Sequence, residues 1–156
     1  MYIHSLDFDD FCEEEYYLIG IHTTLEDYKL AYLLNKQLKT NLTKEVYSLD
    51  FETEKKNASF SVFSYTNYTY DFDWFLISNS YKSERKIQLS QLLLSSEIKT
   101  YLIPEKKGVD FFIKIIGNSD TMFISRTIDQ IKEINQVITS YKIDHKTLKS
   151  KDFLIF

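Results

Sequence analysis

The clearest pattern of hydrophobic and polar positions lies in residues 68–74, where aromatic and polar side chains alternate. The aromatic positions are Tyr68, Tyr70, Phe72 and Trp74, and the polar positions between them are Thr69, Asp71 and Asp73. A period of two is typical of a strand with one buried face. The pattern therefore predicts a strand that continues to Ile77, with its aromatic side chains in the core.

Shorter apolar runs predict the remaining strands, because β-branched and aromatic residues favour extended backbone. These runs are residues 16–23, 42–51, 58–65, 98–103, 109–116 and 137–143. A charged turn is predicted at 52–57 and a polar loop at 78–83. The secondary structure of two segments is ambiguous. Residues 89–94 fit a short helix, and residues 137–143 could extend the preceding helix instead of forming a strand.

Two segments have the spacing of amphipathic helices. The first runs from Thr24, a good N-cap residue, to about Leu38. The second carries one apolar stripe opposite charged side chains, as expected of a helix that packs on a sheet. The stripe consists of Ile124, Ile128, Ile131 and Ile134.

The order of these elements predicts an α+β fold, with a mostly antiparallel sheet and two main helices on one face. The layout is loosely similar to ferredoxin-like or ACT-type domains. If 89–94 and 137–143 are helical, the alternative is a secretion-chaperone-like order of α-βββ-α-ββ-α. With 3 Gly and 1 Pro the chain has little linker material, so residues 1–156 are expected to form a single domain. Within it, residues 1–15 are an acidic N-terminal segment and residues 145–156 a C-terminal tail.

The only proline lies in residues 103–111, between two apolar runs, and predicts a hairpin whose loop spans 105–108. Gly108 can supply the positive φ that such a loop requires. The structural interpretation is a turn in which Glu105 and Asp110 are hydrogen-bonded locally. The functional interpretation is a recognition tip, in which Pro104, Glu105, Gly108 and Asp110 are candidate interaction residues.

This segment resembles the signature of the IPExxxVDY family, a bacterial family without an assigned function. Ile103, Pro104, Glu105, Val109 and Asp110 match the motif. Phe111 stands where the family has Tyr, so a phenolic hydroxyl cannot be essential at that position. The segments 26–28, 33–36, 148–151 and 154–156 also look similar to the family. The resemblance implies a bacterial cytoplasmic protein and supplies no catalytic residues.

Composition and charge narrow the range of functions. The net charge of −4 disfavours direct nucleic-acid binding, and no Lys or Arg lies between Asn57 and Tyr81 to accompany the aromatic strand. Cys12 is the only cysteine, and the three histidines show neither metal-ligand nor catalytic spacing. We therefore expect no enzyme activity, no metal and no cofactor.

The C-terminal tail ends in an apolar run that includes Phe153 and Phe156. Such side chains favour burial, so we expect the tail to dock against the sheet, in its own subunit or across a homodimer. The first residues do not have the pattern of a signal peptide, and no apolar run approaches the ~20 residues that span a bilayer. The chain is therefore expected to be cytoplasmic, without a membrane partner.

These observations favour a non-catalytic protein-interaction or regulatory module, with a protein partner or a second copy of itself. The alternative is a small-ligand sensor of the ACT type, which requires a pocket at a strand–helix or dimer interface. An enzyme is the least favoured of the three.

Overall fold

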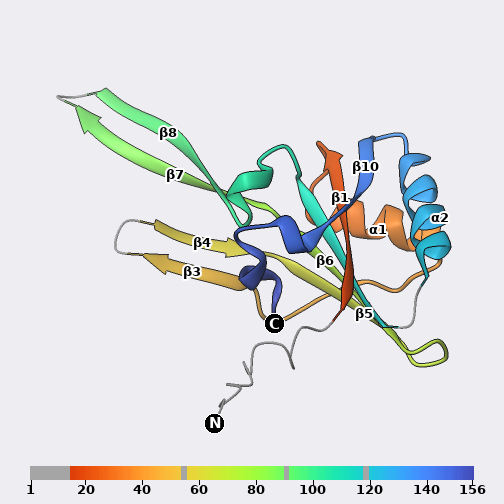
Figure 1. Cartoon of the computed structure of the whole chain (residues 1–156). Helices are drawn as coiled ribbons and strands as arrows, with labels where there is room; N and C mark the ends of the chain where they lie inside the picture. Colours follow the sequence, from red (N-terminus) through yellow and green to blue (C-terminus); the bar gives the residue numbers. More distant parts are fainter. Residues whose placement is uncertain (1–14, 54–55, 90–91, 118–119) are drawn as a thin grey trace, which may run out of the picture.

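The described residues form an α+β structure around one six-stranded antiparallel sheet. A computed structural model describes residues 15–53, 56–89, 92–117 and 120–156. The strands, in spatial order, are β10 (Val137–Ile143), β1 (Tyr16–Thr23), β9 (Phe111–Gly117), β6 (Phe72–Ser78), β5 (Val62–Asn67) and β2 (Thr43–Lys44). Helices α1 (Asp27–Leu38) and α2 (Thr121–Lys132) cover one face of the sheet (Figure 1). The predicted fold class is therefore confirmed.

Strands that follow one another across a helix in the sequence are not neighbours in the sheet, because a third strand lies between them. β9 lies between β1 and β6, and β1 lies between β9 and β10. This order is compatible with the loosely ferredoxin-like layout expected from the sequence. β5 and β2 extend the sheet beyond these four strands.

Two further pairs of strands form hairpins beside the sheet. They are β3 (Leu49–Thr53) with β4 (Lys56–Phe60), and β7 (Ser80–Leu89) with β8 (Leu92–Tyr101). Both extend away from the helices on the same side of the molecule (Figure 1). The β7–β8 ladder alone joins ten residue pairs.

The β7–β8 hairpin corrects three predictions. Strand β7 begins at Ser80, inside the predicted polar loop, and the described residues of 89–94 belong to strands rather than to a short helix. Because β8 pairs with β7, residues 98–103 and 109–116 are not the two arms of one hairpin. A leucine-rich run has no period that separates helix from strand, so the pairing partner decides its structure.

The secretion-chaperone-like alternative is also wrong. It requires helices at 89–94 and 137–143, but the second of these segments is strand β10, as the preferred prediction had it. Three β-branched residues at positions 137–139 favour this extended backbone.

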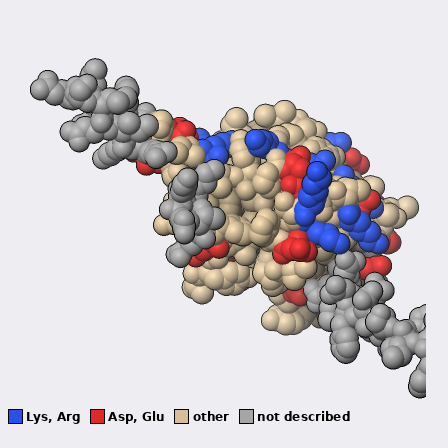
Figure 2. All heavy atoms as spheres, turned by 60° about the vertical axis from the view of Figure 1, so that its left-hand side comes forward, with Lys and Arg blue, Asp and Glu red and all other residues tan. Residues whose placement is uncertain are grey.

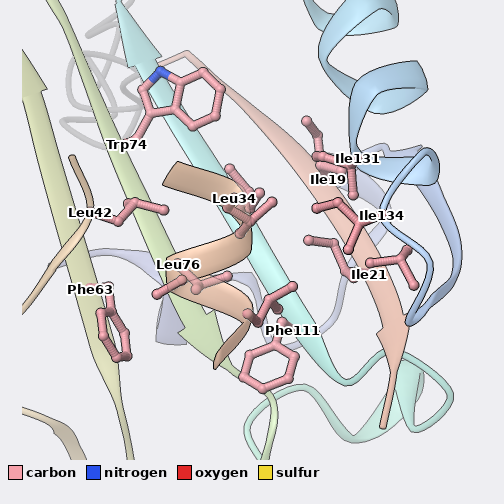
Figure 3. Close-up of a cluster of buried hydrophobic side chains, with 14 of the residues drawn as sticks. Ile19, Ile21, Leu34, Leu42, Phe63, Trp74, Leu76, Phe111, Ile131 and Ile134 are labelled. Carbon is pink, nitrogen blue, oxygen red and sulfur yellow. The ribbon is translucent and has the colours of Figure 1, made fainter. Parts of the chain in front are cut away.

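The first hydrophobic core fills the space between the sheet and the two helices. β1, β6 and β9 contribute Ile19, Ile21, Trp74, Leu76, Phe111, Ile113 and Ile115, and the helical side contributes Leu30, Leu34, Ile124, Ile131 and Ile134 (Figure 3). The predicted stripe of α2 is thus largely buried, with Ile128 packed at its margin. Burying each of these large side chains stabilises the fold by about 1.5–3 kcal/mol.

A second core covers the opposite face of the sheet. Its buried members are Leu18, Ala58, Phe60, Ile77, Leu102, Ile103, Val109, Phe112, Ile143, Leu148 and Leu154. They come from the sheet, from β4, from the segment after β8 and from the C-terminal tail. Both faces of the sheet are therefore packed, which explains why apolar runs dominate its central strands.

Several helix and strand boundaries in the structure differ from the predicted ones. Helix α1 has Glu26 rather than Thr24 as its N-cap residue, because Thr23 organises the turn before the helix by accepting a hydrogen bond from the Leu25 N–H. The predicted strand at 42–51 divides into β2 and β3, and the strand at 58–65 is divided between β4 and β5.

The predicted strand at 68–77 begins four residues late, at Phe72. Tyr68 and Tyr70 lie exposed in the β5–β6 turn, and Asp71 adopts a positive φ of 54°. The side chain of Asn67 stabilises this turn, because its Oδ1 accepts hydrogen bonds from the backbone N–H groups of Thr69 and Tyr70. Alternation therefore indicated the strand correctly from Phe72 onward but not within the turn.

Candidate functional site

The segment that carries the family-like motif forms a loop between β8 and β9, built on a 3-10 turn at Pro104–Lys106. A fully buried side chain, Asn79, holds this loop together. Its Oδ1 accepts from the Ile103 N–H at 2.8 Å, and its Nδ2 donates to the carbonyls of Lys106 at 2.9 Å and Val109 at 2.7 Å. Sequence analysis missed Asn79, because it placed this polar residue in a solvent-exposed loop.

Gly108 does not have the role that was predicted for it. In the described part of the chain, the residues with positive φ are Lys39, Asp71 and Gly117. A Cβ at Gly108 would instead lie 3.1 Å from Cε1 of His22. Close approach of a neighbouring ring therefore favours glycine there. Pro104 occupies the first turn of the 3-10 segment, where its missing N–H is tolerated.

Glu105 and Asp110 both accept hydrogen bonds from segments distant in the sequence. Glu105 accepts hydrogen bonds from the backbone N–H of Ser150 at 2.7 Å and from its Oγ–H at 3.0 Å, 45 residues away. Asp110 accepts from the backbone N–H of Thr23 at 2.9 Å, 87 residues away. The two carboxylates therefore join the loop to the C-terminal tail and to the end of β1.

The contact with the tail contributes to the ionisation of Glu105. Burial of its carboxyl disfavours the charged form, but hydrogen bonds from Ser150, together with those from the backbone of Glu105 and Lys149, outweigh this effect and lower its pKa.

The C-terminal tail packs on the sheet face opposite the helices, as expected for docking within one subunit. Leu154 is fully buried, whereas Phe153 is 42% and Phe156 40% exposed. Phe153 meets Phe51 edge to face, and Phe156 meets Phe75 in the same way. The anchor of the tail is therefore Leu154 rather than either candidate phenylalanine. Of the acidic N-terminal segment 1–15, only the exposed Glu15 lies within the described residues.

A buried lysine fixes the end of the tail. Lys114, in the central strand β9, donates from Nζ to the Leu154 carbonyl at 2.6 Å. Its Nζ also lies 4.7 Å from the ring centroid of Tyr16 and 4.8 Å from that of Phe156. These contacts help compensate for the burial of the cation.

A second feature, a cavity of about 780 Å³, lies at one end of the core between the sheet and the helices. Its lining comes from the end of α1, from β5, β6 and their turn, and from α2. The lining residues are Leu38, Lys39, Thr40, Tyr65, Asn67, Thr69, Tyr70, Phe72, Trp74, Asp120, Phe123, Thr127 and Gln130. This size is in the range of small-molecule sites, about 300–1,000 Å³.

Five aromatic rings line the cavity and form a connected cluster. Phe72 is at its centre, with ring centroids of Tyr65, Tyr70, Trp74 and Phe123 at 6.4, 6.2, 6.1 and 6.0 Å. Tyr70 and Phe72 are nearly parallel, at 7°, whereas Trp74 and Phe123 meet edge to face at 82°. The alternation along 70–74 indicated three of these rings, but Tyr65 and Phe123 come from other elements.

The polar groups around the cavity differ in how accessible they are. Trp74 is only 2% exposed, and its Nε1–H, which has no hydrogen-bond partner among the described residues, is buried and not open to the cavity. Tyr65 accepts from the side-chain amide of Asn67 at 3.0 Å, which leaves its own O–H to donate. Asp120 is the N-cap of α2 and accepts from the Phe123 N–H, while Lys39 is the C-cap residue of α1.

The other titratable candidates are dispersed. His22 is hydrogen-bonded to the Tyr141 hydroxyl at 2.9 Å, and His145 stacks on Tyr16 with ring centroids 3.9 Å apart. Cys12 and His4 lie outside the described residues. Within the described ranges, no group of three or more His, Cys, Asp or Glu side chains is placed to hold a metal ion.

The described surface mixes charges of both signs. On the face shown in Figure 2, Lys and Arg side chains lie interspersed with Asp and Glu rather than forming one continuous basic area. No helix in the described part of the chain is long and apolar enough to cross a membrane. Weak nucleic-acid affinity stays a prediction from the net charge.

Comparison of the chain with models of known protein families, with characterised proteins and with solved structures gave no match. The resemblance to the IPExxxVDY family therefore stays a prediction, and the geometry of the chain itself has to support any functional proposal.

Proposed function

We propose that the protein is a non-catalytic regulatory domain that binds a small molecule in the aromatic cavity. The observation that carries the proposal is the cavity itself, which lies at a strand–helix interface and is lined by five aromatic rings. A ligand sensor requires a pocket in this position, and concave, mainly apolar sites with a few polar groups are typical of ligand binding.

Trp74 makes the proposal directly testable, because it is the only tryptophan of the chain. Its fluorescence reports on the cavity without labelling. We expect that protein isolated from its native cells under non-denaturing conditions carries a small molecule, visible by native mass spectrometry. Adding that molecule back to stripped protein should change Trp74 emission and raise the melting temperature.

A blocking variant and a matched control locate the binding. Gln130 lines the cavity, and the neighbouring Asp129 does not, although both are exposed on α2. Gln130→Phe should abolish binding, while Asp129→Phe should retain it. The proposal is refuted if no co-isolated molecule or library compound changes Trp74 emission, or if both variants bind equally well.

A protein-interaction module is the second candidate function, supported by a separate observation. Tyr28 and Tyr32 are both exposed and lie four positions apart, on neighbouring turns of α1. Exposed aromatic side chains are enriched in interaction sites. Replacing both with Ser should eliminate a partner from an affinity pull-down while leaving the melting curve unchanged. Retention of every partner would refute this candidate.

A further inference from the structure

We propose that two copies of the chain associate through strand β10, so that their six-stranded sheets join edge to edge across a two-fold axis. β10 contributes no residue to the lining of the cavity, so this contact is separate from the proposed function. Three observations on β10 support the contact: its position in the sheet, the direction of its backbone groups and the nature of its exposed side chains.

Strand β10 is the long edge of the sheet. It has seven residues, whereas β2 at the opposite edge has two. Among the described residues, β10 pairs with β1 on one side only, and α2 packs against it (Figure 1). Proteins usually protect an edge by keeping it short or by placing prolines or charged side chains on it. The β2 edge is short, but the β10 edge is long and contains no proline.

The hydrogen bonds of β1 show which backbone groups of β10 point outward. Ile21 faces Ser140 in the ladder, but its carbonyl accepts from the N–H of Asp110, which directly precedes β9. The backbone groups of Ile21 therefore point away from β10. In an antiparallel pair the partner of such a residue also points away. The N–H and C=O groups of Ser140, and those of Lys142 two residues later, are thus directed into the open edge.

A second copy fits this edge in an antiparallel register centred on Tyr141. Ser140 of each copy then lies opposite Lys142 of the other, and the two residues exchange backbone hydrogen bonds with the groups that point outward. The two Tyr141 residues form a directly opposed pair without backbone hydrogen bonds, the kind of pair in which side chains lie closest. No charged side chain of β10 faces another charged side chain.

The neighbouring registers are less favourable. A shift of one residue would bring side chains of opposite faces together. A register centred on Lys142 would place two ammonium groups directly opposite each other. A register centred on Ser140 would depend on Ile138, where the pairing with β1 is irregular, because Thr139 pairs with His22 and Val137 with Thr23. Residues 139–143 form the regular part of the strand, and the register centred on Tyr141 uses all of them.

The exposed side chains at this edge favour a second copy as the occupant. Ile138 is 73% and Tyr141 36% exposed, and the two-fold axis brings the apolar groups of both copies together. Lys142 does not guard the edge, because its Nζ lies 5.0 Å from the ring centroid of Tyr17 in the adjacent strand β1. Each copy uses its long edge once, so association stops at the dimer.

The first test is the mass of the full chain in solution. Sedimentation velocity over the micromolar range should show a dimer that dissociates on dilution. Tyr141→Lys removes the aromatic pair and places like charges opposite each other, so it should weaken the dimer about tenfold while the melting curve of the subunit is kept. Tyr68→Lys makes the same change at an exposed position in the β5–β6 turn and should leave the dimer unchanged.

The second test is cross-linking in a Cys12→Ser background, which removes the only natural cysteine. Tyr141→Cys should form a disulfide-linked dimer under mild oxidation, because Cα atoms of such a pair are about 4.5 Å apart. Thr139→Cys, on the same strand, should not, because its two copies lie about 14 Å apart in this register. A chain that stays monomeric and does not cross-link overturns the proposal, and leaves the edge to a strand of another protein. A dimer that tolerates Tyr141→Lys, or that cross-links through Thr139→Cys instead, overturns it as well.

Discussion

Replacing Asn79, which lies between β6 and β7, with Ala should destabilise the protein by releasing the loop between β8 and β9. The substitution removes three hydrogen bonds from a fully buried side chain. The Lys106 carbonyl keeps a second partner, the Val109 N–H at 3.0 Å. The Ile103 N–H and the Val109 carbonyl lose the partner that Asn79 provided. Since an unsatisfied buried group costs about 1–3 kcal/mol, we expect a loss of about 2–4 kcal/mol in the free energy of unfolding.

The assay is thermal and urea unfolding followed by circular dichroism. For a chain of this size each kcal/mol shifts the melting temperature by about 2–4 °C, so the expected decrease is roughly 5–15 °C. Exposed Asn135 provides the control, because Asn135→Ala should stay within about 0.5 kcal/mol. Asn79→Asp keeps the size but places a carboxylate against two carbonyl oxygens, and its destabilisation should shrink at acidic pH. If Asn79→Ala and Asn135→Ala melt together, the loop does not depend on this side chain.

Three further changes test other contacts. Leu154→Ala should cost about 2–5 kcal/mol in unfolding free energy, whereas Ile155→Ala, at an exposed position, should cost little; equal melting curves would mean that the tail is not anchored. Gly117→Ala would place a Cβ 2.4 Å from the Asp71 carbonyl oxygen, at a residue whose φ is 129°. The variant should therefore lose about 1–3 kcal/mol of unfolding free energy, more than Gly108→Ala loses. A lower urea midpoint for Gly108→Ala than for Gly117→Ala would contradict this expectation. Because the folded-state pKa of Glu105 is lowered, its contribution to stability should be present at neutral pH and be lost as the pH falls through that pKa; the melting difference between Glu105→Gln and the wild type should therefore vanish in acid, and a constant difference would refute it.

Sequence patterns predicted those elements whose secondary structure follows from the pattern of apolar residues alone. The isoleucine stripe of α2 and the runs that form β1 and β10 lie where they were expected. The helical stripe and the apolar strand runs both indicate which side chains are buried, and burial stabilises these elements.

Pairing partners and buried polar residues were not predictable in this way. β8 pairs with the preceding strand β7 rather than with the following strand β9, and no local sequence pattern distinguishes these two pairings. Asn79 looks like a loop residue in the sequence, yet its fully buried side chain makes three hydrogen bonds. The aromatic cavity combines residues from both helices and two strands, so only Tyr70, Phe72 and Trp74 were visible as a group.

The position of β1 in the sheet has a consequence for how the chain folds. β1 is near the start of the chain, but Ile19 pairs with Ile113 on one side and with Lys142 on the other. Contacts between residues so distant in sequence form slowly. The hairpins β3–β4 and β7–β8, whose strands are sequence neighbours, can close much earlier. During synthesis both edges of β1 therefore stay unpaired until residues 111–143 have emerged. A chain that ends before residue 111 should lack both partners of β1, and such open edges recruit other chains into aggregates.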